Sequence, residues 1–176
     1  MEIVNFFEKL AGRWFSQRTT HDLSAQQSKA GQSNLEATFL AATAPPVQQL
    51  CEQLGVDASL ALCGLEITQT STVDGNPQQR TGSALVVPLT PESDTAGELL
   101  RSGTGVAPAK SRYSWEAEIF TVSSEADDIR SEERWWFITD NLRMRTNILK
   151  RPDGFHLASF CSEIRLGVKR PPADAA

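Results

Sequence analysis

The chain has 176 residues, of which 40% are hydrophobic and 22% are charged. This composition is typical of a globular protein of one domain and excludes the disordered, collagen-like and low-complexity classes. The 17 basic residues are outnumbered by 22 acidic ones, which gives a net charge of -5. A general affinity for nucleic acid or for an anionic membrane is therefore not expected.

Membrane segments and cysteine-based sites are also not predicted. The apolar runs are far shorter than the roughly 20 residues that cross a bilayer. Glu2 and Glu8 interrupt the region where a secretory signal would be continuously apolar, so we expect a cytoplasmic protein. Cys51, Cys63 and Cys161 have spacings that match neither a disulfide framework nor a zinc site, which predicts buried thiols and no metal.

The first residues have the apolar spacing of an amphipathic helix. Ile3, Phe6, Phe7 and Leu10 recur at i, i+3, i+4 and i+7, and Gly12 follows at a position typical of a helix end. From Trp14 onward the pattern favours a strand. Because side chains alternate in a strand, two faces are predicted: Trp14, Ser16, Arg18 and Thr20 on one, and Phe15, Gln17, Thr19 and His21 on the other.

The middle of the chain predicts a turn at 28–33, a strand at 34–39 and a second helix. Pro45 and Pro46 can open this helix because proline in a first helical turn loses no hydrogen bond, and Gly55 marks its end. Further strands are predicted in the order 60–72, 82–89, 97–101, 112–122, 132–139, 142–149 and 155–165.

Two early helices and about nine strands without a βαβ rhythm predict a mostly β protein. We expect an antiparallel meander that closes into a β-barrel, with a helix as a plug or flap. A barrel of this size can enclose one small ligand, as lipocalins do. Residues 1–168 are expected to form one domain, and 169–176 a flexible tail.

The segment 142–149 carries the most informative polar pattern. In a strand, Arg143, Arg145 and Asn147 project to one face, which places the two guanidinium groups about 7 Å apart. Guanidinium groups bind carboxylates through paired charge-assisted hydrogen bonds, so this face suits a ligand with two carboxylates. The same pattern is also typical of a solvated strand face that pairs with glutamates on its neighbour.

The preceding strand joins this one through a short turn at 140–141. It places Glu132, Arg134 and Trp136 on one face and Glu133, Trp135 and Phe137 on the other. Aromatic walls with a few charges suit a large conjugated ligand, whereas ordinary core packing explains the same tryptophans. His21 could exchange protons near neutral pH, although lone histidines are more often surface residues. Dinucleotide, P-loop, hydrolase and zinc-protease motifs are absent from the sequence.

Four segments together resemble the S-type phycobiliprotein lyases of cyanobacteria and some algal plastids. They are 5–19, 131–134 with its following aromatic residues, 141–146 and 158–165. The resemblance extends over nearly the whole chain. One departure lies after the second helix, where many members have a tryptophan and an acidic residue and this chain has Gln69-Thr70-Ser71.

This resemblance implies a lipocalin-like or fatty-acid-binding-protein-like barrel that attaches a phycobilin, as substrate and not as a prosthetic group, to a cysteine of an apo-phycobiliprotein. The acceptor would be a phycocyanin or allophycocyanin subunit, in the cyanobacterial cytosol or a plastid stroma. The lyase would act as a homodimer or with a related chain. The matching positions are His21 and Glu133 for catalysis, and Arg18, Trp136, Arg143, Arg145 and Glu163 for binding.

Two further hypotheses belong to other functional classes. A non-catalytic carrier of an anionic apolar ligand would have the same barrel and the same paired arginines. A ligand-free structural adaptor would fill the barrel interior with side chains. Covalent attachment of the pigment to a partner cysteine, faster than spontaneous addition, distinguishes the lyase from both.

Overall fold

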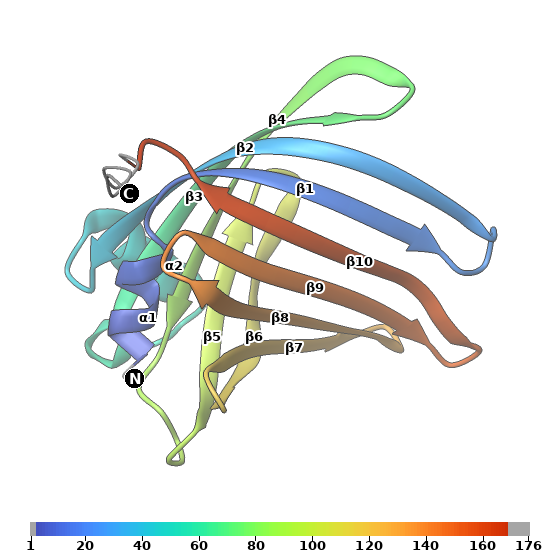
Figure 1. Cartoon of the computed structure of the whole chain (residues 1–176). Helices are drawn as coiled ribbons and strands as arrows, with labels where there is room; N and C mark the ends of the chain where they lie inside the picture. The colour runs from blue at the N-terminus through green and yellow to red at the C-terminus, as the bar shows by residue number, and fades with distance from the viewer. Residues whose placement is uncertain (1–2, 169–176) are drawn as a thin grey trace.

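The computed structural model describes residues 3–168 and contains two α-helices and ten strands (Figure 1). A short 3-10 helix, Ala58–Leu60, precedes β3. The elements in chain order are α1 (Ile3–Leu10), β1 (Gly12–Asp22), β2 (Gln27–Ala41), α2 (Pro45–Gln53), β3 (Cys63–Val73), β4 (Asn76–Pro88), β5 (Ala96–Gly103), β6 (Val106–Glu116), β7 (Ile119–Ala126), β8 (Ile129–Thr139), β9 (Leu142–Arg151) and β10 (Gly154–Arg165).

The strands form a closed antiparallel barrel. Each strand pairs with the next along the chain, and β10 pairs with β1 to close the sheet, with Trp14 opposite Arg165 and Arg18 opposite Cys161. Closure leaves no unpaired edge along the sheet as a whole. The predicted mostly β, lipocalin-like meander barrel is confirmed.

Helix α1 closes one end of this barrel (Figure 1). Its residues Phe6, Phe7 and Leu10 are at most 1% exposed and pack inside the barrel against aromatic side chains such as Phe120. The helix stops before Gly12, whose φ of +122° is costly for any residue with a side chain. The predicted plug is therefore confirmed, and the turns β1–β2 and β9–β10 lie at the opposite end.

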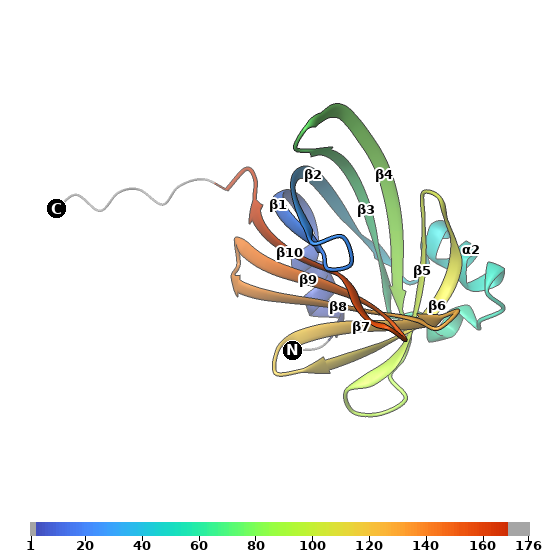
Figure 2. The ribbon, with the colours of Figure 1, turned by 90° about the vertical axis from the view of Figure 1, so that its right-hand side faces the viewer.

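Helix α2 lies outside the barrel wall, beside β5 (Figure 2). Pro45 stands in its first turn, as predicted. Val47 and Leu50 pack in a second apolar cluster with Val87 and Leu100, on the outer side of the sheet. Gly64 permits the close approach, because a Cβ atom there would lie 2.6 Å from Val47 Cγ2.

Two strand predictions are wrong in detail. The predicted strand 112–122 is a hairpin of β6 and β7, whose turn residues Ala117 and Glu118 have φ values of 49° and 63°. The predicted turn at 28–33 belongs to β2, where Gly31 faces Thr72 O so closely that a Cβ atom would lie 2.9 Å away. The turn at 117–118 contains no glycine to signal it, and the glycine at position 31 wrongly indicates a turn.

Within residues 3–168, neither helix is both long and apolar enough to cross a membrane. The predicted flexible tail, 169–176, lies outside the described residues.

Candidate functional site

Two adjacent cavities of about 380 and 490 Å³ lie along the inner face of the barrel and open to solvent. Gln69, Glu133 and Arg145 line both of them, so these three side chains stand at the junction. The smaller cavity also contacts Ile67, Gly82, Ser83, Ala84, Val86, Arg101, Ser102, Gly103, Thr104, Val106 and Trp135. The larger one also contacts Arg18, Thr20, Asn147, Leu157, Ser159 and Cys161.

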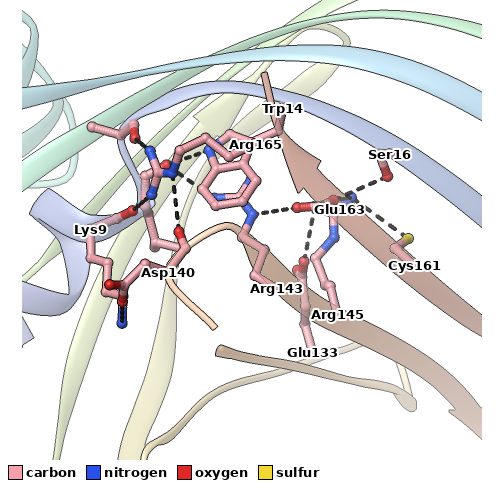
Figure 3. A network of polar contacts seen from close by, with 12 residues as sticks. Lys9, Trp14, Ser16, Glu133, Asp140, Arg143, Arg145, Cys161, Glu163 and Arg165 are labelled. Atoms are coloured by element: carbon pink, nitrogen blue, oxygen red, sulfur yellow. Dashed lines mark hydrogen bonds and ion pairs between the residues drawn. The ribbon is translucent and has the colours of Figure 1, made fainter. Parts of the chain in front are cut away.

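Arg145 lies at the centre of the polar cluster (Figure 3). Its Nη1 is 3.4 Å from Glu133 Oε1, and its Nη2 is 3.4 Å from Glu163 Oε1 and 3.9 Å from Cys161 Sγ. The side chain is 26% exposed and faces the cavities. Burial opposes its charge, but the two carboxylates raise the pKa of Arg145 above the ordinary arginine value. The guanidinium group is thus held, charged, in the cavity wall.

Arg143 and Arg145 share the inner face of β9, as the alternation predicted, but only Arg145 reaches the cavities. Arg143 is 6% exposed, and its Nε donates to Glu163 Oε2. Its Nη1 donates to the carbonyl oxygen of Leu10, which lies at the end of α1. The predicted second ligand arginine is therefore committed to the protein's own groups.

Glu163 is the most deeply buried carboxylate of the cluster, with 1% exposure. It binds Arg143 and Arg145 and accepts a hydrogen bond from Ser16 Oγ at 3.1 Å. Burial alone would raise the pKa of Glu163, but the two arginine charges outweigh burial and lower it. Glu163 lines neither of the two cavities, and its link to them is the ion pair with Arg145.

Glu133 faces the cavities, whereas Trp136 does not. Trp136 points to the outer face of β8, because it alternates with the buried Trp135 and with Phe137, which packs on the core. Trp135 is 7% exposed and lines the smaller cavity with Glu133. Trp135, and not the predicted Trp136, therefore faces the cavities. The alternation of side chains along a strand already predicts that Trp135 shares a face with Glu133.

Arg18 and His21 lie on opposite faces of β1, as predicted. Arg18 points inward and lines the larger cavity. His21 is exposed, lines neither cavity, and its Nδ1 lies 2.7 Å from Ser28 Oγ on the neighbouring strand. The location of His21 does not support the predicted proton transfer within the barrel. His21 is three positions after Arg18, and an odd offset along a strand turns the side chain to the opposite face.

Among the cavity residues that were not predicted for the site are Gln69, Arg101, Trp135 and Cys161. Cys161 and Glu163 are two positions apart on β10 and therefore share a face of the strand, which is a signal that could have predicted Cys161 for the site. Arg101 follows two leucines on β5, and nothing in the local sequence distinguishes it from a surface arginine. Across residues 3–168, no group of three His, Cys, Asp or Glu side chains is arranged to hold a metal ion.

The model of the family described as CpeS-like protein matches residues 2–166. The chain belongs to this family. It is 43% identical over 175 residues to the chromophore lyase CpcS/CpeS of Thermosynechococcus vestitus, covering 97% of this chain and 96% of the relative. The phycocyanobilin lyase subunit CpcS of Picosynechococcus sp. is 32% identical over 178 residues, covering 97% and 89%.

A solved structure agrees with these relatives. The S-type phycobiliprotein lyase CPES from Guillardia theta superposes with a TM-score of 0.84 at 29% sequence identity. The match covers 96% of this chain and 95% of that one. The resemblance predicted from the sequence motifs is confirmed, and with it the fold.

Proposed function

We propose that this chain is a phycobiliprotein chromophore lyase. It takes up a phycobilin, such as phycocyanobilin, and catalyses its attachment through a thioether to a cysteine of an apo-phycobiliprotein subunit. The relatives named as chromophore lyases support this reaction class. The observation that carries the proposal is the position of Arg145 and Glu133 at the junction of two interior cavities.

The cavities suit the size and chemistry of a linear tetrapyrrole. Volumes of about 380 and 490 Å³ lie in the range of small-molecule sites. A phycobilin is a conjugated molecule with two propionates and basic pyrrole nitrogens. Trp135 and Ile67 supply apolar wall for the conjugated rings, whereas Arg18 supplies positive charge.

Glu133 has the chemistry needed to activate the pigment. A carboxylate beside a pyrrole nitrogen stabilises the protonated bilin, which is the better electrophile. The acceptor thiolate then attacks the carbon of the ethylidene group that is double-bonded to the ring. The new carbon–sulfur bond uses the thiolate's electron pair, and the ring carbon of the former double bond takes up a proton. The addition has no leaving group and requires no oxidant.

The function is tested by mixing the protein with phycocyanobilin and an apo-subunit, and measuring covalent pigment after denaturation by mass and zinc-enhanced fluorescence. Replacing Glu133→Gln is expected to slow attachment about 100-fold, the usual scale for a general acid or base. Glu132→Gln is the matched control, because Glu132 lies on the outer face of the same strand, paired with Arg134.

An adduct that requires the protein and is lost with Glu133→Gln supports the proposal. Pigment binding without attachment above the spontaneous level would instead support a non-catalytic carrier. Equal attachment rates for the two glutamine variants would remove Glu133 from the mechanism while leaving lyase activity in place.

The finer features of the proposal concern partner and location. We assign residues 1–168 as the pigment-binding domain and a phycocyanin or allophycocyanin subunit as the acceptor. The reaction would take place in the cyanobacterial cytosol, or in the stroma of an algal plastid. Mass photometry of the pigment-loaded protein, alone and with the acceptor, tests whether the active form is a homodimer.

A further inference from the structure

Glu163 and the three charged side chains around it, Arg143, Arg145 and Glu133, neutralise one another. Arg143 and Arg145 bind Glu163, and Arg145 also binds Glu133. Two positive and two negative groups thus leave no net charge in this cluster. A ligand carboxylate that bound Arg145 would compete with two carboxylates already in place.

Arg101 is a different kind of interior arginine. It lies on the inner face of β5, opposite Val86 of β4, and lines the smaller cavity. Its Nη2 donates to Ser124 Oγ at 2.9 Å. Its Nε is buried and has no hydrogen-bond acceptor among residues 3–168. An unpaired buried donor is costly, so the side chain gains a hydrogen bond when it turns toward a ligand carboxylate.

Arg18 is a second cavity arginine, on the opposite side of the barrel. It lines the larger cavity from β1, and β2, β3 and β4 lie between it and β5. A Cβ atom at Gly31 would lie 3.7 Å from Arg18 Nη2, so the glycine leaves space beside this guanidinium. In the described part of the chain, neither Arg18 nor Arg101 forms an ion pair with a carboxylate.

We propose that Arg101 is a carboxylate-binding residue of the pigment site, and that Arg101 and Arg18 each bind one of the two propionates. This inference rests on the proposed function. These two cavity arginines, which have no acidic partners, match the charge of the two propionates, in a protein whose own net charge is -5. The neutral cluster around Glu163 then interacts with the conjugated rings of the pigment and not with its propionates. This revises the expectation that Arg143 and Arg145 hold the propionates.

The test compares phycocyanobilin with its dimethyl ester, which lacks both negative charges. Binding is measured by the pigment's absorption change, without acceptor. The wild type is expected to prefer the diacid about 100-fold, since each charge-assisted pair contributes about tenfold. Arg101→Met should bind the diacid about tenfold more weakly and the ester unchanged. Arg18→Met should do the same, and the double variant should lose the preference.

Two variants control for charge and for folding. Arg112→Met removes an exposed arginine on the outer face of the neighbouring strand β6, which pairs with Glu92, and should keep the full preference. Arg101→Lys keeps the charge and should retain part of the preference. Thermal unfolding followed by circular dichroism shows whether each variant is folded.

The outcomes separate this inference from the proposed function. A wild type that binds neither pigment overturns both. A wild type that binds and transfers pigment, beside an Arg101→Met variant with undiminished preference for the diacid, overturns this inference alone. An equal loss of diacid and ester binding in Arg101→Met also overturns it, because the side chain would then act through shape and not through charge.

Discussion

The guanidinium of Arg143 stacks on the ring of Trp14, with Cζ 4.2 Å from the ring centroid, and both side chains donate hydrogen bonds to the carbonyl oxygen of Leu10. Arg165 covers Trp14 at the same distance and donates to the carbonyl oxygens of Lys9 and Ala11 (Figure 3). The last carbonyls of a helix lack partners within it. These arginines therefore supply hydrogen bonds to the carbonyl groups at the end of α1 and hold the helix in the end of the barrel.

Replacing Arg143→Met should destabilise the fold before it affects pigment chemistry. The change removes one partner of a buried ion pair and one donor to Leu10 O, which predicts a loss of about 3 kcal/mol in the free energy of unfolding. Urea denaturation measures it. Arg13→Met, at an exposed position of β1, should change this free energy by less than about 0.5 kcal/mol. Equal values for the two variants would contradict a structural role for Arg143.

Glu163 predicts a loss of stability in acid. Its pKa is lowered in the folded protein, so its stabilisation is fully present above the ordinary glutamate pKa of about 4.3 and is lost as the pH falls through the lower, folded value. Denaturation curves between pH 7 and pH 3 should therefore show the wild type losing stability at the acid end. Glu163→Gln should start from a lower stability and vary less over that range. Parallel curves for the two proteins would argue against this coupling.

The two neighbouring tryptophans should affect the pigment differently. Trp135 lines the smaller cavity, whereas Trp136 lies on the outer face of β8. Trp135→Phe is expected to shift the absorption band of bound phycocyanobilin and weaken its binding several-fold, because an indole wall is lost. Trp136→Phe should leave both unchanged. A larger effect at 136 would return the site tryptophan to the position first expected from the sequence.

Cysteine reactivity should report on cavity occupancy. Burial and the charge of Glu8 raise the pKa of Cys63 to about 12, and burial also raises the pKa of Cys51, so both thiols stay protonated at pH 8. Cys161 lines the larger cavity. A small methanethiosulfonate reagent should modify one thiol per native chain, at Cys161, and bound pigment should slow it. Labelling that persists in Cys161→Ser would contradict this assignment.

The fold could be predicted from the sequence because its signals are local. Helix α1 has one apolar stripe and the strands alternate, so the plug and the barrel followed from periodicity. The hairpin at Ala117 and Glu118 was missed because its left-handed residues are neither glycine nor asparagine. Gly31 gave the opposite error, since its small size serves a close contact within β2 and not a turn.

The site was less predictable because its chemistry depends on pairing across strands. Alternation placed Arg143 and Arg145 on one face, but only the register of β10 brings Glu163 opposite Arg143 and neutralises it. Arg101 is distinctive because it forms no ion pair within the described residues, and this depends on strands far apart in the sequence. His21 was carried over by family resemblance, although its strand parity already opposed that of Arg18.

The plug at one end of the barrel has a kinetic consequence. With α1 fixed in place, we expect pigment loading and pigment delivery both to use the end away from the helix. An acceptor subunit docked on an empty barrel would then block loading and form a dead-end complex. We therefore expect a compulsory order of addition, pigment before acceptor, and substrate inhibition when the acceptor is in large excess over the pigment.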